Sequence, residues 1–167
     1  DELLSKNKYF SCVLMDIDNL KELNEYRGYE AGDLYLSSVA NRLKRMEKAY
    51  GAIAARYGGD EFLLIFPGSV LQEGSQELQE LLSVFQRSIT VGGETVYMNS
   101  SGGVAVSNGK DSPRQVVVSA GIAMESAKKK GKNRIVFYTD ELRYEKEAIN
   151  RVLKMLETAI RENAFYM

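Results

Sequence analysis

A run of seven residues, 56–62, combines two glycines with two adjacent carboxylates and reads Arg-Tyr-Gly-Gly-Asp-Glu-Phe. It joins an apolar-ended run, 52–57, to a fully apolar one, 62–66. Glycine supplies the positive φ of tight turns, so the pattern predicts a β-hairpin with Asp60 and Glu61 at its tip. Adjacent carboxylates repel, and a cation such as Mg²⁺, which prefers oxygen ligands, would relieve that repulsion. The same residues also suit a plain solvated hairpin tip.

A second acidic site lies at the end of the apolar run 10–17, which is predicted to be a strand. Asp16 and Asp18 would then point to one face, near the strand end where open α/β sheets place their ligands. Asp18 has an alternative role as the cap of a helix that begins near Asn19. Asp16 has no such role, and a lone buried carboxylate is costly without a partner or a metal. Together with the two carboxylates of the hairpin tip, Asp16 predicts a binding site for two metal ions that could carry out phosphate chemistry.

Composition narrows the classes of function. The 167 residues, 44% of them hydrophobic, suit one domain with its own core. A net charge of -1 and a pI near 5.7 argue against a surface that binds nucleic acid or anionic membrane. Histidine is absent, so proton transfer and metal binding must use carboxylates, lysines or water. Cys12 is the single cysteine and is predicted to be a small buried hydrophobe.

The sequence also carries a prediction of location. No apolar stretch approaches the roughly 20 residues of a transmembrane helix, and the opening Asp1-Glu2 is unlike a signal peptide. We therefore expect a cytoplasmic domain without direct membrane contact, which could also belong to a membrane-anchored multidomain protein.

Strand-like and helical segments alternate along the chain. Strands are expected at about 10–17, 53–57, 61–66, 88–90, 94–106 and 135–138, and helices from Asn19, over 30–49, over 78–85 and over 117–130. The resulting βαββαβ order predicts an α+β fold with a ferredoxin-like core sheet and flanking helices.

Four further segments accompany the Gly-Gly-Asp-Glu-Phe signature in a fixed order. They are Asp-Ile-Asp-Asn-Leu-Lys at 16–21 followed by Asn24, Gly-Asp at 32–33, Ser-Gly-Gly-Val-Ala at 101–105, and Ala-Lys-Lys-Lys-Gly-Lys-Asn-Arg at 127–134. With these segments the chain resembles the GGDEF domain, the diguanylate cyclase family, from about residue 10 to 138. The resemblance implies a sheet like that of nucleotide cyclases.

The resemblance also implies a reaction. Two GTP molecules would be joined into cyclic di-GMP with release of two pyrophosphates, each 3′-hydroxyl attacking the α-phosphate of the opposing nucleotide. Each protomer would hold one GTP, so catalysis would need a homodimer. Mg²⁺ or Mn²⁺ would be held by Asp16, Asp60 and the backbone carbonyl of Ile17, and would activate the attacking hydroxyl. Glu61 would be a further metal ligand or the proton acceptor.

Other family positions imply the contacts to GTP. Asn24 and Asp33 match the guanine-binding residues, and a carboxylate that accepts from guanine N1–H and N2–H would reject adenine. Gly58 and Gly59 would let the substrate approach the backbone closely. The triphosphate would be bound by three lysines, Lys21, Lys128 and Lys132. The two lysines that follow Lys128 are explained by favourable placement at a helix C-terminus.

Many diguanylate cyclases bind their own product at an Arg-x-x-Asp motif shortly before the signature. The matching positions here are Ala49 and Ala52. Alanine supplies neither the bidentate arginine contact to phosphate nor a hydrogen bond to guanine. We therefore expect no product-inhibition site at these positions.

Several positions depart from the usual residues of the family. Arg-Gly-Tyr at 27–29 replaces Tyr/Phe-Gly-His, and Gly121 and Glu125 replace an Asp and a Tyr. Gly102 replaces Ile, which should weaken a strand, and Lys132 replaces an Arg with its bidentate fork. None of these changes removes a metal ligand, so the sequence favours an active cyclase.

Two other hypotheses stay open. The chain could be a catalytically silent GTP-binding domain that controls an adjacent EAL phosphodiesterase. It could instead be a dimerisation or signal-relay domain without nucleotide, which the intact Asp16, Asp60 and Glu61 argue against. GTP binding and catalysis use the same metal ligands, so the sequence does not separate an active domain from a silent one.

The sequence pattern changes after residue 138, which we take as the end of the GGDEF domain. Residues 139–167 are rich in charge, with apolar residues at helical spacing. They could form a terminal helix packed on its own domain. Alternatively, residues 161–167 resemble the start of an EAL phosphodiesterase domain, and the helix would lead to covalently attached EAL and sensory domains. The opening Thr-Gly-Leu-x-Asn-Arg-like segment of the family is absent from residues 1–138.

Overall fold

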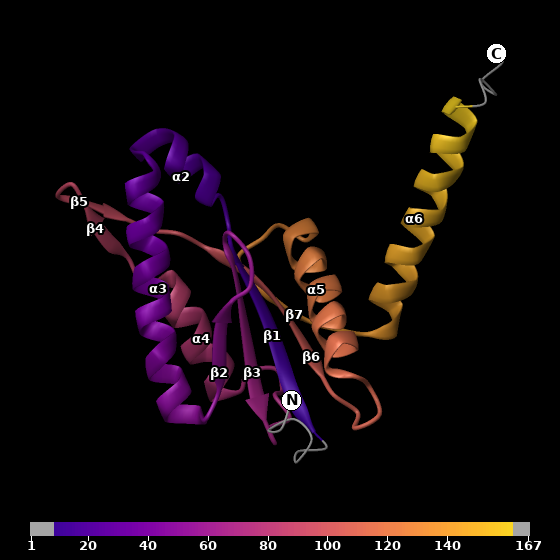
Figure 1. Ribbon diagram of the computed structural model, residues 1–167, viewed down its shortest axis with the longest axis horizontal. Helices are drawn as coiled ribbons and strands as arrows, with labels where there is room; N and C mark the ends of the chain where they lie inside the picture. Colours follow the sequence, from indigo (N-terminus) through magenta and orange to yellow (C-terminus); the bar gives the residue numbers. More distant parts are fainter. Residues whose placement is uncertain (1–8, 162–167) are drawn as a thin grey trace.

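A five-stranded sheet with helices on both faces forms the centre of the protein (Figure 1). The computed structural model describes residues 9–161. The sheet has the strand order β2-β3-β1-β6-β7. Its strands are β1 (Phe10–Ile17), β2 (Ile53–Arg56), β3 (Glu61–Pro67), β6 (Ser100–Val106) and β7 (Ile135–Phe137). The helices are α2 (Leu20–Arg27), α3 (Tyr29–Tyr50), α4 (Gln76–Gln86), α5 (Pro113–Lys129) and α6 (Asp140–Arg161).

Strand β1 lies in the middle of the sheet, and all eight of its residues are buried. Because side chains alternate along a strand, β1 supplies two separate apolar layers. Val13 and Met15 pack in the layer formed with α3 and α4. Cys12 and Leu14 pack against α5, and burial raises the pKa of the Cys12 thiol to about 12. The prediction that Cys12 is a buried hydrophobe is confirmed.

The chain path confirms the predicted ferredoxin-like βαββαβ order. Helices α2 and α3 connect β1 to β2, a hairpin joins β2 to β3, and the segment containing α4 leads back to β6. Strand β1 is antiparallel to both β3 and β6. Strand β7 adds a parallel partner at the β6 edge after α5 has crossed the second face.

Two neighbouring glycines in β6 allow close packing on opposite faces of the sheet. A Cβ at Gly103 would lie 2.0 Å from the backbone oxygen of Ala120, so α5 can approach β6 only because this residue is glycine. A Cβ at Gly102 would lie 2.3 Å from the sulfur of Met15. Met15 thus fills the space that a side chain at position 102 would take.

One predicted strand was wrong. The expected strand 94–106 is two strands, because β5 (Glu94–Val96) pairs only with β4 (Ile89–Val91) in a separate two-stranded sheet. Gly92 and Gly93 make the turn between them, with φ of 57° and 84°. Strand β1 ends at Ile17, opposite Ser100, so the chain before Ser100 has no strand of the main sheet to pair with.

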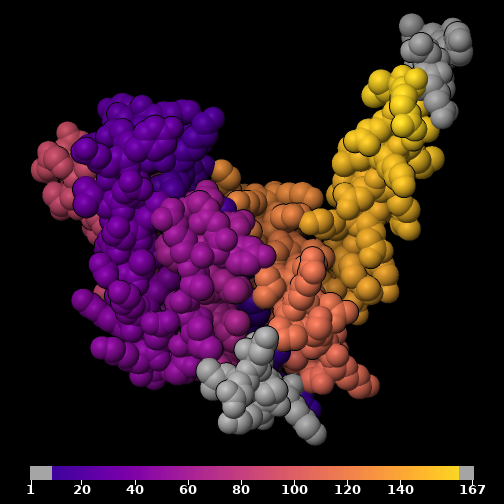
Figure 2. All heavy atoms as spheres, viewed as in Figure 1, coloured from indigo at the N-terminus to yellow at the C-terminus, as the bar shows by residue number. Residues whose placement is uncertain are grey.

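The prediction that the terminal helix packs on its own domain is wrong for most of α6. Leu142 is its only buried residue among those described, and the helix projects from the body (Figures 1 and 2). Lys146 forms an ion pair with Glu125 of α5 at 2.7 Å. Ile149 still lines a small cavity with the end of α5. Helix α5 ends there, and the later apolar residues of α6 are exposed; they are Val152, Leu153, Met155, Leu156 and Ile160. The predicted EAL-like start at 161–167 lies almost wholly outside the described residues.

The helices between residues 9 and 161 include none with the length and apolar character needed to cross a bilayer.

We predict that Gly103→Ala lowers the free energy of unfolding by about 2–3 kcal/mol or more, because backbone atoms of α5 cannot yield as a side chain can. Gly121→Ala is the matched control: its Cβ would meet only Leu14 Cδ2, at 3.8 Å, and alanine favours a helix by up to about 1 kcal/mol. Chemical denaturation measures both variants. Equal stability of the two would contradict the close approach at Gly103.

Candidate active site at the end of strand β1

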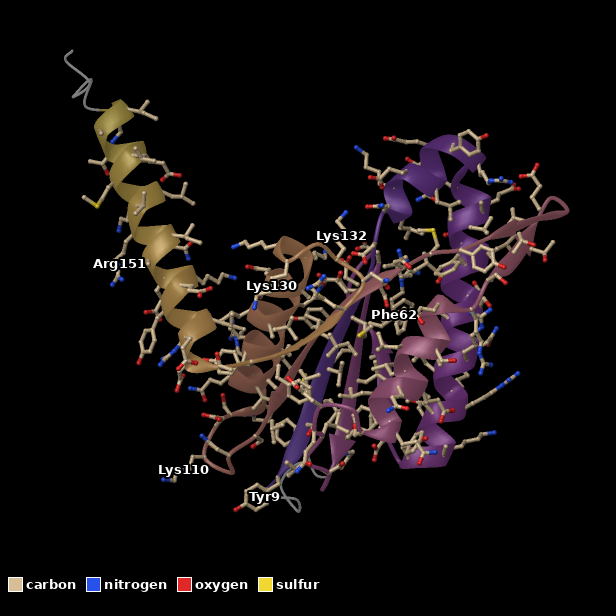
Figure 3. All side chains as sticks on the ribbon, turned by 180° about the vertical axis from the view of Figure 1, so that it is seen from behind. Tyr9, Phe62, Lys110, Lys130, Lys132 and Arg151 are labelled. Carbon is tan, nitrogen blue, oxygen red and sulfur yellow. The ribbon has the colours of Figure 1, made fainter. Side chains whose placement is uncertain are left out.

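A cavity of about 180 Å³ opens at the C-terminal end of β1. Most of the predicted metal and phosphate residues line it: Asp16, Ile17, Lys21, Asp60, Lys128 and Lys132. They come from β1, α2, the β2–β3 turn, α5 and the loop before β7. Lys130 and Lys132 lie at this end of the molecule, opposite Lys110 and Tyr9 (Figure 3). The fold therefore gathers residues that are more than 110 positions apart in the sequence.

Asp16 is the buried acid of this cavity, with 4% of its surface exposed. The pKa of its carboxyl is raised to about 6, chiefly by burial and also by the negative charges of Asp60 and Glu61. Lys128 opposes this shift through an ion pair of 2.6 Å between Nζ and Oδ2. Asp16 and Glu61 are directly paired across β1 and β3, so the two carboxylates belong to the same face of the sheet.

The β2–β3 turn presents Asp60 and Glu61, both half-buried. The amides of Tyr57 and Gly58 both donate to the carbonyl of Glu61, which closes the turn. Arg56 Nε donates to the carbonyls of Gly58 and Gly59 at 3.2 and 3.1 Å. The sequence analysis did not predict that Arg56 holds the turn, although its position two residues before the glycines could have suggested it.

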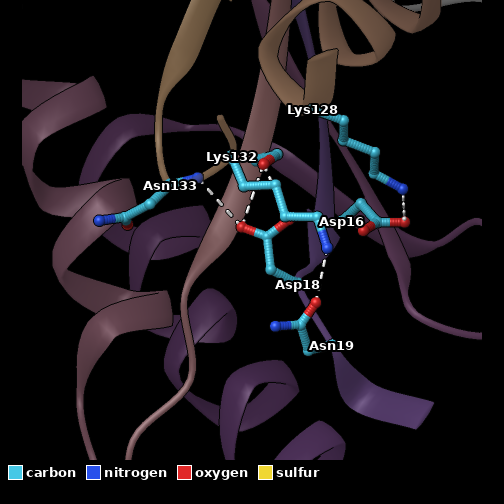
Figure 4. A network of polar contacts seen from close by, with 7 residues as sticks. Asp16, Asp18, Asn19, Lys128, Lys132 and Asn133 are labelled. Carbon is cyan, nitrogen blue, oxygen red and sulfur yellow. Dashed lines mark hydrogen bonds and ion pairs between the residues drawn. The ribbon is translucent and has the colours of Figure 1, made fainter. Parts of the chain in front are cut away.

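Asp18 has a structural role that differs from the predicted alternative (Figure 4). It does not cap α2; the cap position is Asn19, which makes no side-chain capping bond. Asp18 accepts hydrogen bonds from Ser101 Oγ at 2.8 and 3.0 Å and from the amide of Asn133 at 3.1 Å. Because Asp18 is buried, these donors offset the cost of removing its charge from water.

The loop between α5 and β7 is fastened to the start of α2. Lys132 Nζ donates to Asn19 Oδ1 at 2.6 Å (Figure 4). Lys132, Asn133 and Asn19 all have positive φ, of 62°, 48° and 63°. The loop is thus held in a conformation uncommon for residues with side chains, and it places the Lys132 ammonium at the cavity rim.

The residues expected to bind a metal supply oxygen donors, which suits Mg²⁺ or Mn²⁺. Within residues 9–161, however, no group of three or more His, Cys, Asp or Glu side chains is close enough to hold an ion. Asp16 is instead paired with Lys128. The donor set fits a divalent cation on condition that Lys128 releases Asp16.

The predicted guanine-binding residues do not line this cavity; they lie at the corner between α2 and α3. Asn24 Oδ1 is buried and finds no hydrogen-bond partner within residues 9–161. It lies against Gly32, where a Cβ would come within 2.0 Å of it. Asp33 follows on the exposed surface of α3. The unpartnered amide marks the corner as a polar site set apart from the acidic one.

The two predicted turn glycines differ in the space beside them. Gly59 is exposed, and a Cβ there would meet nothing within 4 Å. A Cβ at Gly58 would lie 3.1 Å from Glu61 Oε2.

A larger cavity, of about 610 Å³, lies between the first half of α5 and the start of α6, and none of the predicted site residues lines it.

The sequence matches one family over most of its length. Residues 1–134 match the family described as "Diguanylate cyclase, GGDEF domain". The chain belongs to the GGDEF domain family.

It is also similar to two proteins of Pseudomonas aeruginosa. The first is the bifunctional diguanylate cyclase/cyclic di-GMP phosphodiesterase MucR, 28% identical over 84% of this chain and 21% of MucR. The second is the cyclic di-GMP phosphodiesterase NbdA, 26% identical over 82% of this chain and 18% of NbdA.

The GGDEF domain of DgcB from Caulobacter crescentus, solved in complex with c-di-GMP, has a similar structure. The TM-score is 0.74, with 27% identity over 82% of this chain and 84% of that chain. The nucleotide-cyclase-like fold is thereby confirmed. The GGDEF chain spans about a fifth of the length of the two curated relatives. The family and the relatives support a function related to cyclic di-GMP.

We predict that Ser101→Ala lowers the free energy of unfolding by about 1–3 kcal/mol, because Asp18 would lose a donor while its charge stays buried. Ser100→Ala is a matched control on the adjacent residue, since Ser100 Oγ is also buried but has no hydrogen-bond partner in the described part of the chain. That control should be neutral or stabilising in the same denaturation experiment. An equal loss in both variants would mean that the bond to Asp18 does not stabilise the fold.

Proposed function

We propose that this GGDEF domain is a diguanylate cyclase that condenses two GTP molecules into cyclic di-GMP and two pyrophosphates at a dimer interface. One observation carries the proposal: the buried Asp16 carboxylate lies in a cavity whose rim combines the acidic Asp60 with Lys128 and Lys132. An acid that can attract a cation beside ammonium groups that can attract phosphate suits phosphoryl chemistry.

Asp16, Asp60 and the backbone carbonyl of Ile17 would hold Mg²⁺ or Mn²⁺, with Glu61 as a further ligand or the proton acceptor. When bound, the metal would lower the pKa of the 3′-hydroxyl and stabilise charge on the phosphate. Glu61 is directly opposite Asp16 across the β-ladder, so it is in position to receive a proton near that carboxylate.

Three lysines would bind the triphosphate. Lys128 and Lys132 come from the end of α5 and the loop after it, and Lys21 comes from the first turn of α2. Lys128 would exchange Asp16 for a phosphate oxygen when substrate and metal enter. Gly59 leaves room for the nucleotide to approach the turn backbone, and at Gly58 the nucleotide would come close to the Glu61 side chain.

Guanine would be bound at the corner of α2 and α3. The Asn24 oxygen faces Gly32, and its amide nitrogen lies farther from that glycine, so the nitrogen is the atom available to donate to guanine O6. The Asp33 carboxylate would accept from N1–H and N2–H. Adenine presents an amino group and an unprotonated nitrogen at the same edge, so both contacts would fail.

The acid cavity and the guanine corner together would hold one GTP in each protomer. The 3′-hydroxyl of that GTP must reach the α-phosphate of a second nucleotide, so the proposal requires a homodimer with facing sites. A divalent cation and a second copy of the domain are therefore both needed for turnover.

A second candidate is a catalytically silent GTP-binding domain that regulates an attached EAL phosphodiesterase. The ion pair of Asp16 with Lys128 favours it, because this contact competes with metal binding. The relative NbdA is named as a phosphodiesterase. On either function, we propose that residues 1–138 are the GGDEF domain and that residues 139–167, which include the projecting helix α6, link it to an EAL domain.

The proposal is tested by incubating the protein with GTP and Mg²⁺ or Mn²⁺ and identifying the product by mass spectrometry. The protein is tested both alone and fused to a dimeric coiled coil.

We predict that Asp60→Ala lowers turnover to below about 1% of wild type, because a metal ligand is lost. Its stability should change by less than about 0.5 kcal/mol, because alanine keeps the backbone carbonyl that accepts from the Ile17 amide. Lys130→Ala, exposed and outside the cavity, should retain full activity.

Normal turnover by the Asp60→Ala protein would overturn the metal assignment. If the wild-type protein bound GTP but formed no cyclic di-GMP even as a forced dimer, the silent regulatory function would replace the cyclase.

We also predict that cyclic di-GMP inhibits this domain only in competition with GTP. The positions that would form a product site hold Ala49 and Ala52, and Ala52 is 6% exposed. Neither supplies an arginine contact to phosphate, so the affinity there should be lost. Initial rates measured over a matrix of GTP and cyclic di-GMP concentrations give the type of inhibition. Inhibition that saturating GTP does not relieve would refute this prediction.

A further inference from the structure

Tyr29 is an exposed aromatic residue at the edge of the proposed guanine site. It is the first residue of α3, directly after Gly28, and 80% of its surface is exposed. A large aromatic side chain with so little contact is not explained by the core of the domain.

The helical geometry places Tyr29 between the two proposed base-binding residues. Successive residues of a helix are rotated by about 100°. Relative to Tyr29, Gly32 is therefore rotated by about −60° and Asp33 by about +40°. Gly32 is the residue that contacts Asn24, so a base held by Asn24 and Asp33 lies over the sector into which Tyr29 projects.

We propose that Tyr29 is a positioning residue whose ring stacks on the face of the guanine base. This inference rests on the proposed function, since it requires GTP at the corner of α2 and α3. Asn24 and Asp33 read the edge of the base, and neither covers its face. Stacking on an aromatic side chain contributes about 1–3 kcal/mol per base, which is about 5-fold to 150-fold in affinity.

Tyr26 provides a matched comparison on the other side of the same corner. It is 83% exposed, and the guanidinium carbon of Arg27 lies 5.5 Å from its ring centroid. Asn24 and Tyr26 are two residues apart on α2 and so point about 200° away from each other. Tyr26 is equally exposed but faces away from the proposed base.

The test is calorimetric titration with a GTP analogue that has a methylene bridge between the α and β phosphorus atoms, which prevents turnover. Inorganic tripolyphosphate is titrated in parallel. Tyr29→Ala should weaken binding of the analogue about 5-fold to 150-fold and leave tripolyphosphate binding unchanged. Tyr29→Phe should restore wild-type affinity, because it keeps the ring, and Tyr26→Ala should match wild type.

Each other outcome overturns the inference. If wild type binds the analogue and Tyr29→Ala binds it equally well, Tyr29 does not stack, while the proposed function stands. If Tyr29→Ala weakens tripolyphosphate to the same extent, or Tyr29→Phe fails to restore affinity, the side chain does not act on the base by stacking. If wild type binds no analogue, the inference and the proposed function fail together.

Discussion

Burial of a carboxylate at the end of the central strand is the constraint on which the rest of the site depends. Asp16 lies on a strand whose eight residues are all buried, so its charge must be offset by groups from other elements. The ammonium of Lys128 does so from α5. The buried Asp18 imposes a similar requirement, met by Ser101 on β6 and the amide of Asn133. Asp16 and Asp18 thereby hold α5, β6 and the loop before β7 together at one end of the sheet.

The packing of α5 makes that arrangement possible. Lys128 reaches Asp16 because α5 lies close against the sheet, and the helix lies there because Gly103 has no side chain. On the opposite face, Gly102 leaves the space that Met15 fills. The glycine that departs from the usual isoleucine of the family is therefore part of a complementary pair. Local strand propensity alone would count it only as a weakness.

The two parts of the proposed nucleotide site, the acid cavity and the guanine corner, are held in place to different degrees by the surrounding structure. The acid cavity is built on the central sheet, where the buried Asp16 carboxylate pairs with Lys128 and the buried Asp18 carboxylate accepts from Ser101. The guanine corner is a helix–turn–helix unit at the surface, where the buried Asn24 Oδ1 has no hydrogen-bond partner among the described residues and exposed side chains surround it. A rigid phosphate site beside a less supported base site would let the nucleotide itself complete the second one.

The sequence by itself determined the signature turn, the buried strand β1, the βαββαβ order of the elements and the family. These depend on local spacing, on the glycines of the turn and on continuous or periodic apolar residues. Tertiary structure alone decided the partners of Asp18, which are 83 and 115 residues away. It also decided that β5 leaves the main sheet and that α6 projects from it. Periodicity identifies which face of an element is apolar, but the neighbour that covers that face is set by where distant elements end.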